Sequence, residues 1–250
     1  MRYSTIAIFT RTSPFSIMKS LTTLFKFSTY VGALSLIATL AACGGGGDNS
    51  SSGGNTSPKP NPITVAPTLN CSTDGIAAST ASTATVTVCM LTSDGEIVIA
   101  LDPAKAPITV TNFQQYVNSG FYSNTIFHRV VPGFVVQGGG YTTGYVVKAN
   151  SKLPIALESQ NGLSNLRGTI AMARTDVPAS ATSQFFFNTV DNLNLNYSSS
   201  TSPGYAVFGK VISGSATIDK INAETQLYAS AETPATEVLL YWAKQLKPAP

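Results

Sequence analysis

The feature that most limits the folds open to this chain is a pair of alternating runs around an Asp-Gly turn. In "TATVTVCMLTSDGEIVIALD", β-branched and apolar residues alternate on both sides of Asp94 and Gly95, which is a strong signal for a β-hairpin. Short strand-like runs then recur along the chain: "TIFHRVV", "FVVQGGG", "GTIAMAR", "SQFFFNTV", "YAVFGKVI" and "TEVLLYWAKQL". This succession predicts a mainly β fold, an antiparallel barrel or sandwich rather than a βαβ repeat.

Two helical segments are expected among these strands. The segment "APITVTNFQQYVNSGFY" has Pro107 as a helix start and Gly120 as a stop, with Val110, Phe113 and Tyr116 at helical spacing. A shorter helix is expected near "SATIDKINA". Because 43% of the 250 residues are hydrophobic, the chain can bury a sizeable core.

Charge is unevenly distributed along the chain. The first 42 positions hold four of the 15 basic residues and none of the 12 acidic ones, which leaves 11 basic against 12 acidic residues in the remainder. A near-neutral remainder without basic runs is not typical of a protein that binds nucleic acid. We therefore expect no nucleic-acid partner.

The first 42 residues are predicted to be a secretory signal peptide, with Met18 as an alternative start. Lys19 and Lys26 precede "FSTYVGALSLIATLAAC", an uncharged run of about 17 residues, which is short for a membrane span of about 20. Its end, "LAAC", resembles the bacterial lipobox and implies a diacylated Cys43 that becomes the new N-terminus. The alternative is an ordinary cleavage site with a coincidental cysteine. By the same resemblance, Gly44 after the cysteine implies the outer membrane, on the periplasmic side of a bacterial cell envelope.

Residues 43–68 are rich in Gly, Ser, Asn and Pro, and this composition predicts a flexible spacer. A lead-in follows at residues 69–84. Cys71 in the lead-in and Cys89 in the first strand could form a disulfide in an oxidising compartment, and two free thiols are the alternative. One histidine and no C-x-x-C pair give no basis for a metal site.

Four segments carry a resemblance to a known family. "NFQQYVNSGFYSNTIFHRVVPGFVVQGGG", "RGTIAMAR", "SQFFFN" and "GYAVFGKV" resemble, in order and spacing, the signature segments of cyclophilins, the peptidyl-prolyl cis/trans isomerases, and in particular their bacterial periplasmic branch. The resemblance covers Thr85 to Leu246, so the domain is expected at residues 85–250. It implies a closed eight-stranded antiparallel β-barrel capped by two α-helices, with a binding groove on the outer face. It also implies a monomer that acts on proline-containing polypeptides without a cofactor.

The chemistry of isomerisation agrees with an arginine beside an apolar run. Rotation about an X-Pro amide is slow because resonance gives the bond double-bond character, with a barrier of about 18–20 kcal/mol. In the twisted state the prolyl nitrogen recovers a lone pair, so a donor to that nitrogen stabilises the twisted state more than the planar one. Arg129 is suited to this role because it stays protonated and has several N–H donors.

The resemblance assigns a role to eleven residues. Arg129 would be catalytic, and the residues that bind substrate would be Phe134, Val135, Gln137, Met172, Ala173, Arg174, Gln184, Phe186, Leu195 and Tyr205. Of the three adjacent phenylalanines, alternation sends Phe185 and Phe187 to one face of a strand and Phe186 to the other. Asn194 stands where many cyclophilins have an aromatic residue, which predicts weaker binding of cyclosporin-type macrocycles.

Two functions follow from this pattern. The first is a peptidyl-prolyl isomerase that assists the folding of envelope or secreted proteins. The second is a non-catalytic proline-peptide binding or chaperone module tethered to the membrane. The presence of Arg129 and Gln137 favours catalysis. Hydrolase chemistry has no support, because His128 is the only histidine and no G-x-S-x-G segment is present.

Overall fold

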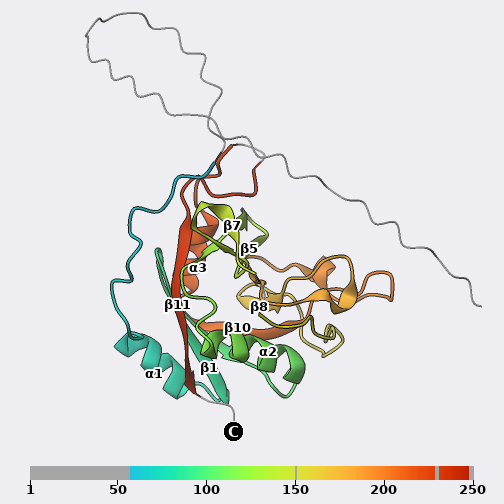
Figure 1. Cartoon of the computed structure of the whole chain (residues 1–250). Coiled ribbons are helices and arrows are strands. Elements are labelled where there is room, and N and C mark those ends of the chain that lie inside the picture. Colours follow the sequence, from blue (N-terminus) through green and yellow to red (C-terminus); the bar gives the residue numbers. More distant parts are fainter. Residues whose placement is uncertain (1–56, 150, 229–230, 248–250) are drawn as a thin grey trace, which may run out of the picture. The chain divides into compact units, whose positions relative to one another are not determined.

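The computed structural model describes residues 57–149, 151–228 and 231–247 (Figure 1). The strands of the described residues form one antiparallel sheet, and the prediction of a mainly β fold is confirmed. The strands are β1 (Val86–Thr92), β2 (Gly95–Leu101), β3 (Thr125–Phe127), β4 (Arg129–Val131), β5 (Val135–Gly138), β6 (Tyr141–Thr142), β7 (Val146–Val147), β8 (Thr169–Met172), β9 (Phe185–Asn188), β10 (Val207–Ser213) and β11 (Val238–Lys247). Their order in the sheet is β4-β5-β9-β8-β10-β2-β1-β11-β3-β6-β7.

The predicted hairpin is formed by β1 and β2, and its turn brings Thr92 opposite Gly95. Every residue of β1 is buried, although alternation sends successive side chains to opposite faces. Val88 and Met90 belong to the interior core, whereas Cys89 and Leu91 belong to a second cluster on the other face. β1 is therefore covered on both faces, which explains its nearly continuous apolar sequence.

The sheet curls because the chain segment that contains β3 and β4 pairs with one strand along its first half and with a different strand along its second half. β3 pairs with β11 and β4 pairs with β5, and only His128 separates β3 from β4 along the chain. β4, the first strand of the order, is thus covalently continuous with β3, the ninth. By its hydrogen bonds the sheet is nevertheless open and has eleven strands. The expected closed barrel of eight strands is not seen in this pairing. The difference arises because bends such as the one at His128 divide the expected strands into shorter ones.

The helices are α1 (Thr73–Ala81), α2 (Pro107–Asn118) and α3 (Ser215–Asn222), with 3-10 turns η1 (Thr143–Tyr145), η2 (Pro178–Ser180) and η3 (Leu193–Leu195). α2 and α3 are the two predicted helices. α2 begins at Pro107 and buries Phe113 among the rings of Tyr122, Phe185 and Phe208. The carboxylate of Glu158 accepts hydrogen bonds from the first backbone N–H groups of α2, at 3.1 and 2.8 Å, as a capping side chain does. None of the helices in the described residues is long and apolar enough to cross a membrane.

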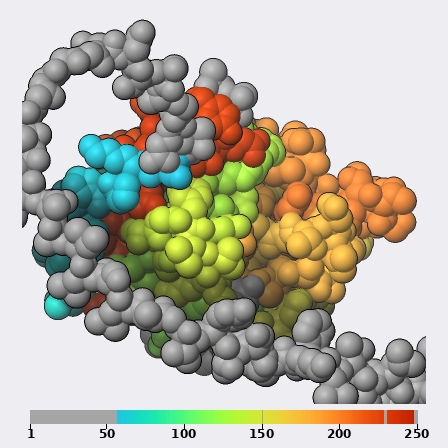
Figure 2. Space-filling view, turned by 45° about the horizontal axis from the view of Figure 1, so that its top comes forward, coloured from blue at the N-terminus to red at the C-terminus, as the bar shows by residue number. Residues whose placement is uncertain are grey.

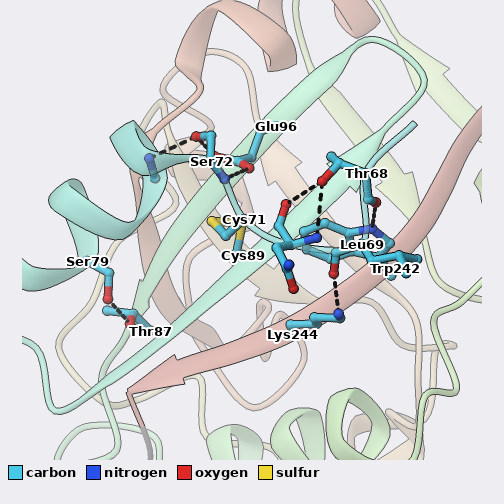
Figure 3. Close-up of a disulfide and its surroundings, with 12 residues drawn as sticks. Thr68, Leu69, Cys71, Ser72, Ser79, Thr87, Cys89, Glu96, Trp242 and Lys244 are labelled. Atoms are coloured by element: carbon cyan, nitrogen blue, oxygen red, sulfur yellow. Dashed lines mark hydrogen bonds between the residues drawn. A yellow bond between two sulfur atoms is a disulfide. The ribbon is translucent and has the colours of Figure 1, made fainter. Parts of the chain in front are cut away.

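The third helix, α1, was not predicted, and it belongs to an N-terminal segment that lies on the domain. We call residues 57–72 the strap. Within the strap, the Thr68 carbonyl accepts a hydrogen bond from the Trp242 indole at 2.8 Å (Figure 3). Cys71 at its end forms a disulfide with Cys89 of β1. Part of the expected spacer, from residue 57 onward, is therefore packed against the domain. Cys43 and residues 1–42 lie outside the described residues.

Candidate active site

A row of outward-facing residues crosses four neighbouring strands. In the sheet register, Arg129 of β4 is opposite Gln137 of β5, Gln137 is opposite Phe186 of β9, and Phe186 is opposite Ala171 of β8. Directly opposite residues on one face have neighbouring side chains. The register thus brings an arginine, an amide and an aromatic ring into one line, although the ring comes from a distant part of the sequence.

An apolar patch surrounds the Phe186 end of this row. Its buried members are Val135, Ala171, Phe186 and Val207, and its partly buried members are Phe134, Leu163, Ala173, Leu195 and Tyr205. The ring of Tyr205 packs edge-on against Phe186, with centroids 5.5 Å apart. Six of the predicted site residues meet here. Leu163, Ala171 and Val207 were not predicted, although the alternation of β8 already places Ala171 on the face of Ala173.

Met172 was also predicted to line this patch, and the structure contradicts that. Its side chain is 2% exposed and belongs to the interior core, together with Phe185 and Phe187. The reason is the alternation of β8, which turns Ala171 outward and Met172 inward. The same rule correctly separated Phe186 from its two neighbours.

A chain of hydrogen bonds fixes the polar end of the row. Arg129 Nη1 donates to Gln137 Oε1 at 3.4 Å, and Gln137 Nε2 donates to Gln184 Oε1 at 3.0 Å. Arg129 Nε donates to Glu232 Oε2 at 2.6 Å. This hydrogen bond to the guanidinium lowers the pKa of the Glu232 carboxyl below its usual value. The predicted residues Arg129, Gln137 and Gln184 are thus in contact, and Glu232 is a member that sequence reasoning missed.

Glycine makes room for one of these polar groups. A Cβ atom at Gly140 would lie 2.6 Å from the side chain of Gln184, so a larger residue there would force Gln184 to move. Gly139 before it has φ of 82°, in the region that favours glycine. The glycine run after β5 therefore lets Gln184 lie beside Gln137.

His128 adjoins the site as a neutral side chain. Burial, reinforced by the nearby charge of Arg129, lowers its pKa to about 4. Its ring packs on Tyr141, with centroids 4.4 Å apart, and its buried Nδ1 has no hydrogen-bond partner among the described residues. At neutral pH, Arg129 is therefore the only one of these two neighbours that has a positive charge.

Arg174 borders the other side of the patch. Its guanidinium lies 4.7 Å from the ring centroid of Tyr205, and its Nε donates to the Gly204 carbonyl at 2.9 Å. Such stacking of a cation on a ring is favourable. Arg174 and Tyr205 therefore hold each other in place at the edge of the patch.

Buried asparagines hold the turn that presents Leu195. Asn192 Nδ2 donates to Asn188 Oδ1 at 2.8 Å and to the Phe134 carbonyl at 2.9 Å. Asn165 Nδ2 donates to the Leu195 carbonyl at 3.1 Å. Asn194, which lies between Asn192 and Leu195 in the chain, is exposed. The sequence predicts none of these contacts, because isolated asparagines are usually read as loop residues.

The arrangement suits a small apolar ring next to a fixed cationic donor. The patch offers aromatic and aliphatic walls, and Arg129 adds N–H donors at its edge. Among the described residues, the only group of candidate metal ligands is Cys71, Cys89 and Glu96. The two sulfur atoms there are bonded to each other, so they are not thiolate ligands.

Known proteins are similar to this chain in sequence and in fold. The profile of the family described as "Cyclophilin type peptidyl-prolyl cis-trans isomerase/CLD" matches residues 87–242. Peptidyl-prolyl cis-trans isomerase A of Dickeya dadantii is 54% identical over 142 residues, which are 57% of this chain and 74% of the relative. Peptidyl-prolyl cis-trans isomerase B of Escherichia coli is 54% identical over 132 residues, 52% of this chain and 80% of the relative.

A solved structure gives the same result for the fold. It is a cyclophilin type peptidyl-prolyl cis-trans isomerase of Cryptosporidium parvum, crystallised in the presence of the dipeptide Ala-Pro. Its TM-score is 0.55 at 27% identity, and the match covers 63% of this chain and 97% of the other. The likeness therefore covers nearly all of a cyclophilin domain, and the segment before β1 lies outside the family match.

Proposed function

Because this chain belongs to the cyclophilin-type family and is a peptidyl-prolyl cis-trans isomerase, we propose that the row from Arg129 to Ala171, with the apolar patch around it, is its active site. The observation that supports this most directly is the position of Arg129, one strand from Gln137 and two from Phe186. The proline ring of a substrate would lie on Phe134, Phe186 and Leu195. Its flanking backbone would contact Gln137 and Ala173.

Arg129 would act on the prolyl nitrogen. In the planar amide that nitrogen is a poor acceptor, and in the twisted state it gains a lone pair to which a guanidinium N–H can donate. The apolar patch would add to this effect, since it disfavours the charge-separated planar form. Val135, Arg174, Gln184 and Tyr205 would border the bound peptide and fix its orientation.

Exchange NMR on a short X-Pro peptide tests this role. Protein lacking residues 1–43 should accelerate cis/trans exchange, and Arg129→Ala should lower kcat/KM by about 100-fold while much of the peptide binding remains. Lys210→Ala, which removes an exposed cation outside the patch, should leave the rate unchanged. If Arg129→Ala is as active as the native protein, Arg129 is not the catalytic residue. If the native protein binds the peptide without accelerating exchange, the site is a binding module for proline peptides or a chaperone.

We also propose that the enzyme works in the bacterial cell envelope, on envelope or secreted proteins, and as a monomer. The support comes from the sequence of the first 43 residues, where the predicted signal peptide ends in a lipobox-like cysteine. The Cys71–Cys89 disulfide agrees with an oxidising compartment. Mass spectrometry of the mature N-terminus would find a diacylated Cys43 if the anchor exists, and fractionation would place the protein with the outer membrane.

The closed eight-stranded barrel remains our proposal for the working architecture. It is supported by the continuity of β3 and β4 through His128. Counted as one strand, they pair with β11 on one side and β5 on the other. The ring would then contain this strand and, in order, β5, β9, β8, β10, β2, β1 and β11.

A further inference from the structure

A glutamate from a distant loop contacts Arg129 through its side chain and the next residue, Val130, through its backbone. Glu232 Oε2 accepts from Arg129 Nε at 2.6 Å, and the Glu232 carbonyl accepts from the backbone N–H of Val130 at 2.7 Å. β4 is the first strand in the sheet order, so one of its edges has no neighbouring strand within the part of the chain that the structure describes. Glu232 is bonded to the backbone of β4, which fixes where its carboxylate meets Arg129.

Some N–H groups of the Arg129 guanidinium are bonded to protein groups that hold the side chain in place. Others remain available to a substrate. A guanidinium has five N–H groups in a fixed fork. Nε is bonded to Glu232, and Nη1 is in a long contact with Gln137 at 3.4 Å. Nη2 has no hydrogen-bond partner among the described residues. The carboxylate therefore occupies the Nε–H group and leaves the N–H groups of Nη2 available to a ligand.

The loop that presents Glu232 is itself held in place. Ala235 N–H donates to the Thr225 carbonyl at 2.7 Å, and Leu227 N–H donates to the Thr233 carbonyl at 2.9 Å. From outside the loop, Lys59 of the strap donates its N–H to the Ala235 carbonyl at 2.8 Å. In Figure 2 the start of the strap, in cyan, lies against the red segment that contains this loop. The carboxylate is thus presented by a loop with bonds within itself and to a neighbouring segment.

Resting on the proposed role of Arg129, we infer that Glu232 is a positioning residue for catalysis. It fixes the guanidinium by its Nε so that Nη2 faces the prolyl nitrogen of a bound peptide. A free arginine side chain has many rotamers, and holding it in one geometry costs conformational entropy. A carboxylate that is fixed in place restricts the arginine before the substrate binds. We expect the resulting benefit to appear as a higher kcat.

The exposure of the pair separates this role from a role in folding. The side chains of Arg129 and Glu232 are 33% and 53% exposed, and exposed ion pairs contribute little to stability. Glu232 variants should therefore fold normally. The pair of Arg167 with Asp219 is a matched control, because its side chains are 54% and 47% exposed and it lies outside the patch.

The test measures kcat and KM on an X-Pro peptide by exchange NMR, together with the Nε–H resonance of Arg129. Glu232→Ala should lower kcat/KM by about tenfold through kcat, with KM nearly unchanged. Glu232→Gln keeps an acceptor oxygen and should restore most of the rate. The Nε–H resonance of Arg129 should shift and exchange faster with water in Glu232→Ala. Asp219→Ala should change neither the rate nor this resonance.

The pH profile adds a readout that a structural role would not change. The pKa of Glu232 is lowered, so its charge is present above that pKa and lost as pH falls through it. The native rate should therefore decline in the acid range, below pH about 4.5, toward the rate of Glu232→Gln, and this step should be absent in that variant.

Two outcomes overturn the inference. One is a Glu232→Ala variant with native kcat/KM, and the other is an unchanged Arg129 Nε–H resonance. The double variant separates this failure from failure of the proposed active site: if Glu232 acts through Arg129, removing both groups should cost no more than Arg129→Ala alone. If Arg129→Ala itself has no effect, the proposed active site is wrong, whatever Glu232 does.

Discussion

His128 shows how a partly buried side chain contributes to the acid response of this protein. Beside Arg129, it could have added a second positive charge to the site, but its pKa is lowered to about 4, mainly by burial. A neutral ring packs on Tyr141 without a counter-ion. The lowered pKa makes the free energy of unfolding depend on pH, because in mild acid the unfolded chain binds a proton at His128 that the folded chain does not bind.

The sign and size of this pH dependence of the free energy of unfolding can be measured. Histidine in an unfolded chain has a pKa near 6.5, so between pH 6.5 and 4 the unfolded state takes up more protons. The free energy of unfolding should therefore fall by about 2 kcal/mol from pH 7 to pH 4.5. Urea unfolding of the native protein and of His128→Gln at both pH values checks this. The part of the decline due to His128 should be absent from the variant, and equal declines would show that His128 titrates normally.

Residue-scale prediction succeeded or failed according to whether the rule was local. Alternation in a strand placed Phe186 outward, and the same rule would have placed Met172 inward had it been preferred to the resemblance. No local rule of this kind predicted the position of Glu232. It is 103 positions from Arg129, and their contact depends on which loop reaches the edge of β4. No pattern near either residue could have indicated that.

At the scale of elements, local signals specified the hairpin and α2, and they did not specify α1. Asp-Gly fixed the turn, and Pro107 fixed the start of α2. α1 has only two buried residues, Gly75 and Ser79, so no apolar stripe marked it. Its one local signal was Ser72, whose hydroxyl accepts from the Gly75 N–H at 3.0 Å as an N-cap. The contacts that hold this region are long-range: the disulfide, and Glu96 bonded to Ser72 (Figure 3).

The disulfide should stabilise the domain by restricting its unfolded chain. Cys71 and Cys89 are 18 positions apart, and a loop of this size corresponds to about 3 kcal/mol in the chain-entropy treatment. Denaturant unfolding of the oxidised and the reduced native protein should differ by about 2–4 kcal/mol. Cys71→Ala/Cys89→Ala should unfold like the reduced protein and be insensitive to reductant. Equal stability of the oxidised and reduced forms would mean that the other strap contacts suffice.

At the scale of the whole molecule, the strap joins parts that the family pattern treats separately. One end is bonded to β1 by the disulfide, and the other pairs with the loop before β11 through Lys59, opposite Thr236. Composition alone predicted a spacer here, because Pro, Ser and Asn cannot form a core. The strap is nevertheless ordered, since its carbonyls accept hydrogen bonds from Tyr241 and Trp242. Only the tertiary structure supplies those donors.

The strap should consequently influence turnover through the loop of Glu232. Lys59 binds that loop by its backbone, donating to the Ala235 carbonyl at 2.8 Å and accepting from the Glu237 N–H at 3.0 Å. Lys59→Pro removes the donor, and Lys59→Ala keeps it. We expect Lys59→Pro to lower kcat/KM by about 2- to 5-fold and to perturb the Arg129 Nε–H resonance, because the carboxylate is held less firmly. Lys59→Ala should match the native protein in both measurements. If Lys59→Pro does so too, the loop holds Glu232 without the strap, and the N-terminal segment acts on stability alone.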